Sequence, residues 1–293
     1  MWPEKFHHLA CPLDGLALVQ YDNILKCAQG HSYDIAREAY VNLLPAQQKK
    51  SRDPGDSKAM IAARTRYLNA GFYQAIADRL DELTLSYLNY GQDLRHCLDA
   101  GCGDGYYLDH LHARILQTQG LQALTLTGLD ISKWAIKAAA KRNRQITWIV
   151  GNSQTAPLKD QSVDILWSVF GFRHLTGFRK VMNSTAKLIM VDAGPDHLLE
   201  LRKIIYPEIR QKHSETSATR QDAEFRQAGF RRIDQQCLSY QIPALSGQPL
   251  ADLLLMTPHL YRASHAGKQA IHDIDQLSLT MDIRYSVFDI DPV

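Results

Sequence analysis

The sequence has few of the features that mark exported or membrane-spanning proteins. Its 293 residues include five cysteines, an odd number that is too sparse for a disulfide framework. No apolar run approaches the roughly 18 residues that a transmembrane helix needs. Residues 1–8 also lack the apolar core of a secretory signal. We therefore expect a cytoplasmic protein with no membrane partner.

Charge of one sign is not in large excess either. The formal net charge of +2 neither demands nor excludes a nucleic-acid partner. Basic residues gather in two clusters, and each fits an ordinary solvated face as well as an RNA contact. The clusters are Lys49, Lys50, Arg52, Lys58, Arg64 and Arg66, and Lys137, Lys141, Arg142 and Arg144. A hydrophobic content of 45% suffices for one large domain, alone or with a small appendage.

Glycine is concentrated in the most informative segment, residues 97–105 (CLDAGCGDG). An apolar strand there ends in Asp99, and Gly101, Gly103 and Gly105 follow at the turn into a helix. Three close glycines let the backbone approach a ligand, and the first turn of the helix presents free N–H groups. The dinucleotide fingerprint has a different spacing. The pattern resembles motif I of the class I S-adenosylmethionine methyltransferases, which implies S-adenosyl-L-methionine as cofactor.

Strands and helices alternate from residue 95 onward, which is typical of a parallel sheet with crossover helices. We expect strands at 124–129, 146–150, 163–170 and 188–191, and helices at 105–117, 132–143, 175–183, 197–212 and 219–228. Two further helices, near 57–68 and 73–88, precede them. Residues 277–287 alternate in polarity, so we expect an antiparallel last strand paired with 230–240. The predicted fold is a Rossmann-like α/β methyltransferase sheet, mostly parallel, with a small N-terminal domain.

Polar residues at the ends of the predicted strands complete a candidate cofactor site. Asp130 ends the strand after motif I, where an acidic side chain can accept both hydrogens of a ribose diol. Its alternative role is a helix N-cap, which Ser132 would serve equally well. Asn152 or Ser153 follows the next strand, where we expect the adenine. No catalytic base can be named. Phe170, Phe172 and Tyr106 lie near strand ends and either pack in the core or receive a flipped base.

Residues 1–45 contain a half-repeat that resembles a zinc ribbon. Cys11-Pro12 precedes Gly15, and Cys27 precedes Gly30-His31, with two short strands expected between them. Cys11, Cys27 and His31 are good zinc ligands, and Asp14 stands where a fourth cysteine would serve. Carboxylate oxygen can bind zinc but more weakly than thiolate. Two interpretations stay open: a zinc site of Cys11, Asp14, Cys27 and His31, or a ribbon held by packing alone.

Strings along nearly the whole chain resemble the RlmA-type 23S rRNA (guanine-N1)-methyltransferases. They lie at 11–13, 30–45, 51–57, 98–107, 129–142, 194–198 and 256–258. The resemblance implies an RNA-binding zinc ribbon (1–45) and a methyltransferase domain (46–293, with N-terminal helices in 56–90). It also implies a dimer and a guanine in a hairpin of large-subunit rRNA as substrate. By this resemblance the cofactor contacts fall on Tyr73, Gly103, Asp104 and His197, and the zinc ligands on positions 11, 14, 27 and 31.

The chain departs from the family pattern in two places: Asp14 replaces a ligand cysteine, and residues 171–174 differ after the fourth strand. Two other functions therefore stand beside rRNA methylation. One is methylation of a small molecule, since the same cofactor domain serves many acceptors. The other is RNA binding without catalysis. The ribbon and the basic residues near 49–66 favour RNA over a small molecule.

Overall fold

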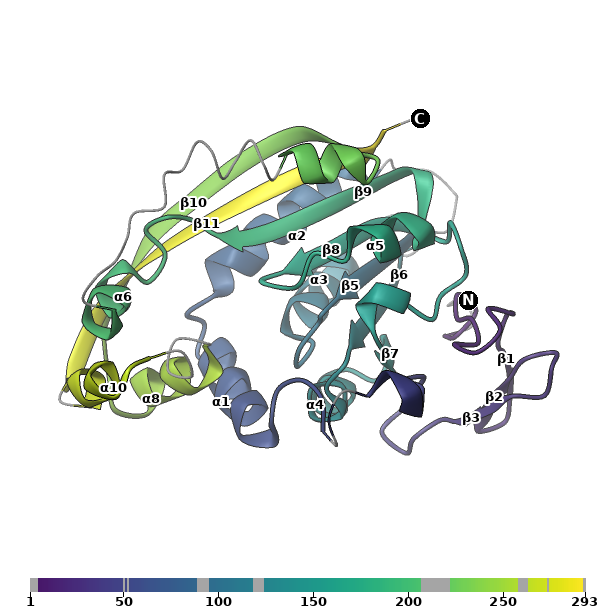
Figure 1. Cartoon of the computed structure of the whole chain (residues 1–293), viewed down its shortest axis with the longest axis horizontal. Coiled ribbons are helices and arrows are strands. Elements are labelled where there is room, and N and C mark those ends of the chain that lie inside the picture. Colours follow the sequence, from purple (N-terminus) through teal and green to yellow (C-terminus); the bar gives the residue numbers. More distant parts are fainter. Residues whose placement is uncertain are drawn as a thin grey trace.

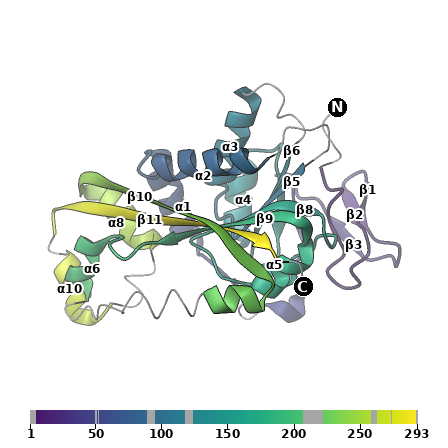
Figure 2. The ribbon, with the colours of Figure 1, turned by 90° about the horizontal axis from the view of Figure 1, so that it is seen from above.

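The computed structural model describes residues 5–49, 51, 53–88, 95–117, 124–206, 222–257, 263–272 and 274–291. These residues form two sheets, a small three-stranded one near the N-terminus and an eight-stranded one that carries most of the chain (Figure 1). The small sheet lies at one end of the molecule, beside the edge of the large one (Figure 2).

The small sheet contains β1 (Val19–Tyr21), β2 (Ile24–Lys26) and β3 (Ser32–Asp34), all antiparallel. The two strands expected here are confirmed, and Asp22 takes a positive φ of 49° in the turn between them. Strand β3 was not predicted, because the polar Ser-Tyr-Asp segment lacks the apolar or alternating pattern of a strand. Its backbone hydrogen bonds come from pairing with β2.

The large sheet has the order β10-β11-β9-β8-β5-β6-β7-β4. Its strands are β4 (Tyr40–Asn42), β5 (Arg95–Ala100), β6 (Leu124–Asp130), β7 (Thr147–Val150), β8 (Val163–Val169), β9 (Met182–Ala193), β10 (Phe230–Ser246) and β11 (Gln276–Ile290). Strands β4 to β9 run parallel, and β11 lies antiparallel between β9 and β10. The Rossmann-like fold and its antiparallel last strand are therefore confirmed, with 230–240 paired to 281–290.

Helices cover both faces of this sheet (Figure 2). On one face lie α2 (Gln74–Tyr87), α3 (Tyr106–Gln117) and α4 (Lys133–Arg142), whose apolar side chains pack on Cys97, Trp148 and Trp167. The other face packs Leu98, Ile149 and Leu166 against α5 (Leu175–Val181) and against apolar residues of the N-terminal region. Side chains alternate between the faces along each strand, so the central strands β5 to β8 are buried on both sides, whereas the edge strand β10 is largely exposed.

Several predicted boundaries are corrected. The strand expected at 188–191 begins at Met182, so the helix expected to reach 183 ends at Val181. Phe170 lies outside β8 and adopts a positive φ of 51°. The helix expected at 197–212 is α6 (Leu199–Ile205), with Leu198 at φ 51° before it and Tyr206 already outside the helix. Residues 207–212 and 219–221 lie outside the described residues, and 222–227 are helical as expected.

Elements between β10 and β11 were not foreseen. Helix α8 (Gly247–Met256) packs on α1 (Lys58–Asn69), and α10 (His265–His272) packs on α6. Asp252 of α8 is 2% exposed and accepts two hydrogen bonds from Arg66 of α1, at 2.9 and 2.5 Å. This bidentate pair fixes α1 against the rest of the fold. No helix in the described part of the chain is long and apolar enough to cross a membrane.

Candidate functional site

The glycine-rich turn connects β5 to α3 at the carboxyl end of the sheet. Gly101, Gly103 and Gly105 all have positive φ, at 102°, 55° and 78°. A Cβ atom on Gly101 would meet nothing within 4 Å, so this side of the turn is open. A Cβ on Gly105 would lie 2.5 Å from the ring of Trp148. Glycine is therefore required at 105 for the helix to pack on β7, and at 101 for the backbone to present an open surface.

Asp130 holds this turn in place. Its carboxylate accepts hydrogen bonds from the backbone N–H groups of Gly103 and Ser132, at 3.0 and 2.8 Å. Ser132 caps α4 by accepting from the Ala135 N–H group, so the alternative of Asp130 as that N-cap is not needed. Burial raises the pKa of Asp130, and the two amide bonds oppose that rise. The loops after β5 and β6 are thus joined at one carboxylate.

Asp99 is the group in the site that most needs a ligand. It is 1% exposed at the end of β5, and neither carboxylate oxygen has a hydrogen-bond partner among the described residues. Burial, together with the nearby charge of Asp130, raises its pKa to about 8. An unpartnered buried carboxyl is costly, and a cationic ligand group would relieve the cost. The site therefore fits a ligand with a positively charged or strongly donating end, such as an amino group.

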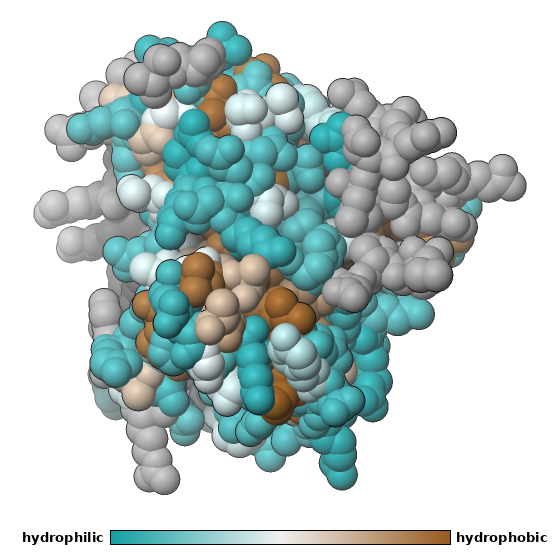
Figure 3. Space-filling view, turned by 90° about the vertical axis from the view of Figure 1, so that its right-hand side faces the viewer, coloured by the Kyte–Doolittle hydropathy of each residue, from teal (hydrophilic) through white to brown (hydrophobic). Residues whose placement is uncertain are grey.

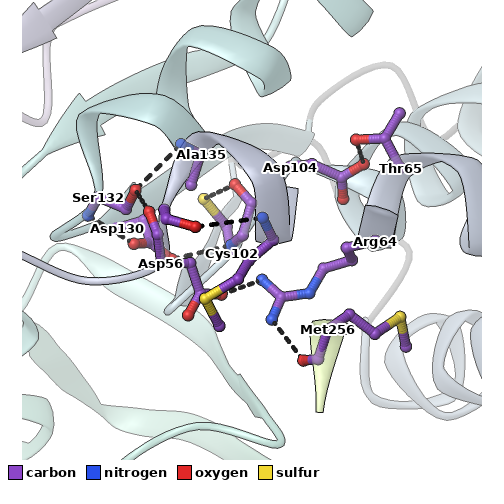
Figure 4. A network of polar contacts seen from close by, with 12 residues as sticks. Asp56, Arg64, Thr65, Cys102, Asp104, Asp130, Ser132, Ala135 and Met256 are labelled. Carbon is purple, nitrogen blue, oxygen red and sulfur yellow. Dashed lines mark hydrogen bonds and ion pairs between the residues drawn. The ribbon is translucent and has the colours of Figure 1, made fainter. Parts of the chain in front are cut away.

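An ion pair between Arg64 and Asp56 also lies over the glycine-rich turn (Figure 4). Arg64 of α1 places its Nη1 atom 2.6 Å from Oδ2 of Asp56. A Cβ on Gly103 would come within 3.4 Å of this Nη1 atom. The segment before α1 is fixed there because the carbonyl oxygen of Asp56 accepts a 2.8 Å bond from Ser132 Oγ. Ser57 caps α1 by accepting a hydrogen bond from the Met60 N–H group.

Asp104 faces away from this open side. Its carboxylate is buried and accepts a 2.8 Å hydrogen bond from Thr65 Oγ1 (Figure 4). It accepts another, at 2.6 Å, from Arg142 Nη2. Arg142 also donates to the Asp104 carbonyl oxygen. The side chain of Asp104 thus ties α1 and α4 to the glycine turn, and a cofactor contact at this residue stays a prediction.

Three aromatic rings meet beyond the ends of β8 and β9. The ring of Phe170 lies 6.2 Å from that of Tyr73 and stacks at 5.9 Å on that of His197. Tyr73 and His197 are buried, whereas Phe170 is 40% exposed. The structure therefore brings together two residues named from family resemblance and one of the three aromatic candidates for the acceptor.

The other predicted residues are spread more widely. Asn152 follows β7 and caps a short helical turn, η2 (Ser153–Thr155), by accepting from the Gln154 N–H group at 2.9 Å. Asn152 and Ser153 remain half-buried beside the end of β6, because the Gly151 N–H group donates to the Asp130 carbonyl oxygen. Phe172 is 81% exposed, and the ring of Tyr106 instead packs near Tyr107. Neither joins the aromatic cluster at Phe170.

The four candidate metal ligands come together in the small N-terminal sheet region. The ligand atoms of Cys11, Asp14, Cys27 and His31 all lie within 4.8 Å of one another. His31 Nδ1 is 3.5 Å from Cys11 Sγ, 3.4 Å from Cys27 Sγ and 2.9 Å from Asp14 Oδ2. These spacings suit four ligands around one tetrahedral ion, and two thiolates with an imidazole favour zinc. The donor set therefore fits zinc, with a carboxylate as the fourth ligand.

From the sequence, neither Arg64 nor Asp56 was assigned to the cofactor site, and Arg64 appeared only in a basic cluster that fits a solvated face or an RNA contact. The motif arguments place ligand residues at strand ends, whereas Arg64 lies in a helix before the first large strand. Its nearness to Gly103 depends on how α1 packs against α4 and α8. No local pattern in residues 56–64 carries that information, so only the tertiary structure reveals the pair.

Comparisons with known proteins agree with both parts of the chain. A family described as "RlmA, N-terminal" matches residues 9–52, and one described as "Methyltransferase domain" matches residues 97–192. A Bacillus subtilis (strain 168) protein is 27% identical over 95% of each chain, and a Micromonospora griseorubida protein is 32% identical over 69% of this chain and 70% of the relative. Both are named, provisionally, as 23S rRNA (guanine-N(1)-)-methyltransferases. A Streptomyces fradiae 23S rRNA (guanine(748)-N(1))-methyltransferase is 31% identical over 66% of each chain.

Proposed function

Because the chain belongs to the family of 23S rRNA (guanine-N1)-methyltransferases, we propose that it transfers a methyl group from S-adenosylmethionine to N1 of a guanine in a hairpin of large-subunit rRNA. One observation carries the proposal. A ribbon with four converging metal ligands and a glycine turn beside the unpartnered carboxyl of Asp99 occur in the same chain. A methyltransferase of small metabolites has no need of the ribbon.

The cofactor would lie along the carboxyl ends of β5, β6 and β7. Asp99 would accept hydrogen bonds from its amino group, because that carboxyl lacks a partner among the described residues. The open face of Gly101 and the backbone of Gly103 would admit the methionine chain of the cofactor. Asp130 would contact the ribose hydroxyls, with Asn152 or Ser153 beside the adenine. Bound S-adenosylmethionine supplies an electrophilic methyl group on a sulfonium.

Tyr73, Phe170 and His197 would form the wall between cofactor and acceptor. Methyl transfer is an in-line displacement, so the main task of these side chains is to orient the guanine and exclude water. A target base must leave its stack, and an aromatic ring such as Phe170 can receive it. As the bond from N1 to the methyl carbon forms, the carbon–sulfur bond of the sulfonium would break and leave S-adenosylhomocysteine. The N1 proton would pass to a base or to water, and a donor at O6 would stabilise the charge that develops there.

The division into an RNA-binding ribbon (1–45) and a methyltransferase domain (46–293) is part of the proposal, as is zinc at Cys11, Asp14, Cys27 and His31. Structural zinc contributes folding energy directly, and it would hold the two knuckles of the ribbon together. The metal would have no part in the chemistry, since its four ligands lie in the small N-terminal sheet region, away from the glycine turn.

We further propose that two copies of the chain associate through the ribbon. Its outer surface exposes apolar side chains: Val19 (51% exposed) and Tyr21 (57% exposed) line a hollow of about 1030 Å³, and Leu13 is 56% exposed elsewhere on the ribbon. Apolar residues gather on this end of the molecule (Figure 3). Such a face is better suited to protein than to phosphate. Sedimentation equilibrium should show a dimer that Tyr21→Ser weakens, and a wild-type monomer at tens of micromolar would reject this part.

A transfer assay tests the central proposal. Tritium from labelled S-adenosylmethionine should appear in 23S rRNA prepared from a strain that lacks the modification, and nuclease digestion should yield labelled 1-methylguanine. Label confined to small-molecule extracts would identify a metabolite methyltransferase instead. Binding of both rRNA and S-adenosylhomocysteine without any transfer would indicate an RNA-binding protein that has lost catalysis.

A further inference from the structure

Arg64 is a cation beside the glycine turn to which the cofactor site described above gives no role. Its guanidinium lies over Gly103, with Nη1 bonded to Asp56 and Nη2 3.4 Å from the carbonyl oxygen of Met256. The side chain is 24% exposed, and that of Asp56 is 31% exposed. The pair is therefore open to solvent and to a ligand that enters the turn, and an exposed pair of this kind contributes little net stability.

Most of the other charged groups around the turn already have hydrogen-bond partners. Asp130 accepts two backbone amides, and Asp104 is bonded to Thr65 and Arg142. In the part of the chain that the structure describes, Arg64 and Arg142 are the arginines in contact with residues 103–104, and Arg142 holds both the carbonyl and the carboxylate of Asp104. Arg64, whose anion Asp56 is partly exposed, is the one free to exchange its partner.

We propose that Arg64 binds the α-carboxylate of the methionine part of the cofactor and gives up Asp56 in exchange. The inference rests on the proposed function, because it assumes that S-adenosylmethionine occupies the turn. The amino-acid end of that molecule is a zwitterion. Asp99 offers an unpartnered carboxyl for its ammonium group, and Arg64 offers a guanidinium for its carboxylate.

The chemistry of the exchange favours this assignment. One carboxylate replaces another at the same guanidinium, and the displaced carboxylate of Asp56, whose side chain is 31% exposed, is then solvated by water. A guanidinium can also bind a carboxylate through two parallel hydrogen bonds. Arg64 is also held in advance. The Ser57 cap fixes the start of α1, and the Arg66–Asp252 pair fixes its middle against α8. Little additional ordering is therefore needed when the ligand arrives.

Two ligands that differ only at the carboxylate test the proposal. S-adenosylhomocysteine carries it, and S-adenosyl-3-thiopropylamine keeps the ammonium, the thioether and the adenosine but lacks it. Isothermal titration of the full chain should show that Arg64→Gln weakens S-adenosylhomocysteine by about 10- to 100-fold and leaves the decarboxylated ligand within about twofold of wild type. Arg64→Lys, which keeps the charge, should recover part of the loss.

Lys58→Ala is the matched control, because Lys58 is an exposed cation in the same helix that does not contact the turn. It should leave both affinities unchanged, and circular dichroism should show α1 intact in every variant. An equal loss for both ligands in Arg64→Gln would make Arg64 a packing residue and overturn the assignment, as would unchanged binding of S-adenosylhomocysteine. If wild type bound neither ligand, the proposed function itself would fail.

Discussion

The ribbon and the large sheet each place an aspartate at the centre of a polar site, and the two carboxyl groups behave in opposite ways. Asp14 lies near the surface of the ribbon, and a bond from the Leu16 amide, with its other polar neighbours, lowers its pKa to about 2. Asp99 is buried in the sheet, where loss of water raises its pKa to about 8. Polar neighbours thus stabilise the charge of Asp14, although Cys11 and Cys27 beside it are buried. The sheet excludes water by itself and keeps a buried carboxyl ready for a ligand.

The largest expected effect is removal of a metal ligand. Cys27→Ser should release zinc and unfold the ribbon, because binding of structural zinc is worth on the order of 10 kcal/mol. The large sheet should remain folded and bind S-adenosylhomocysteine as wild type does. Metal analysis and hydrogen exchange of residues 9–36 would measure the first effect, and titration the second.

Cys237→Ser is the control for that experiment, since Cys237 is exposed on β10 and far from the ligand cluster. It should retain zinc, and a strong chelator should reproduce the Cys27→Ser result in wild type. Less than about a tenth of an equivalent of zinc in untagged wild-type protein, with the ribbon still folded, would mean that packing alone holds it.

Acid should loosen the seam between the two regions. His8 of the N-terminal segment stacks on His96 of β5 at 3.8 Å, and His96 bonds to Thr127 and Ser162. Burial lowers the pKa of His96 to about 4, so its neutral form stabilises the fold above pH 6.5. This contribution, about 3 kcal/mol, should be lost as the pH falls from about 6.5 to about 4.

Urea unfolding at several pH values would measure this loss. Wild type should lose stability faster than His96→Gln over that range, because the unfolded chain takes up a proton at His96 that the folded one refuses. Lys159, Asp164 and the metal ligands are common to both proteins. The charge of His96 also lowers the pKa of His8, so the difference between the two proteins reports on the His8–His96 pair. Parallel curves for the two proteins would contradict the assignment.

A smaller effect is expected at Asp130. Asp130→Ala should weaken S-adenosylhomocysteine by about 10- to 100-fold, because the charge-assisted bonds to the ribose and the support of Gly103 are both lost. Zinc content should not change. Asp130→Ala should thus impair cofactor binding and spare the ribbon, whereas Cys27→Ser should disrupt the ribbon and spare cofactor binding. Asp164→Asn is a matched control, since Asp164 accepts from Arg95 and Asn183 at the other end of the sheet. Unaltered binding in Asp130→Ala would remove Asp130 from the site.

The smallest effect should follow Asp14→Cys. A third thiolate would make zinc harder for a chelator to remove and should modestly raise the free energy of unfolding of the ribbon in excess zinc, while the affinity for S-adenosylhomocysteine should barely change. The rate of zinc release to a colorimetric chelator measures this. Faster release from the variant would show that Asp14 is not a ligand.

The sequence predicted the parts of the fold whose signals are local. Apolar runs marked β5 to β8, alternating polarity marked β11 and suggested its pairing with β10, and a helix was expected near 57–68, where α1 lies. The spacing of cysteine and histidine likewise predicted the four candidate ligands, whose ligand atoms lie within 4.8 Å of one another in the structure. These features depend on residues close to one another in the chain, so a linear pattern carries them.

Features that depend on distant partners could not be predicted in this way. Strand β4 has three residues and exists because β7, more than 100 positions later, supplies its hydrogen bonds. Helix α8 is fixed by Arg66 of α1, nearly 190 positions earlier. Arg64 reaches Gly103 only through the same packing. The strand ends indicated where a cofactor would lie, but not which helix would cover it.

The position of strand β4 has consequences for folding during translation and for N-terminal truncation. Tyr40, Val41 and Asn42 leave the ribosome early, yet they pair with Trp148, Ile149 and Val150, which are synthesised much later. The edge strand β4, which follows the ribbon in the chain, therefore cannot pair until β7 has been synthesised. A shortened chain without residues 1–45 would leave β7 as a bare edge, open to strand exchange with another copy. By pairing with β7, the N-terminal segment therefore covers an edge of the parallel sheet that would otherwise be exposed.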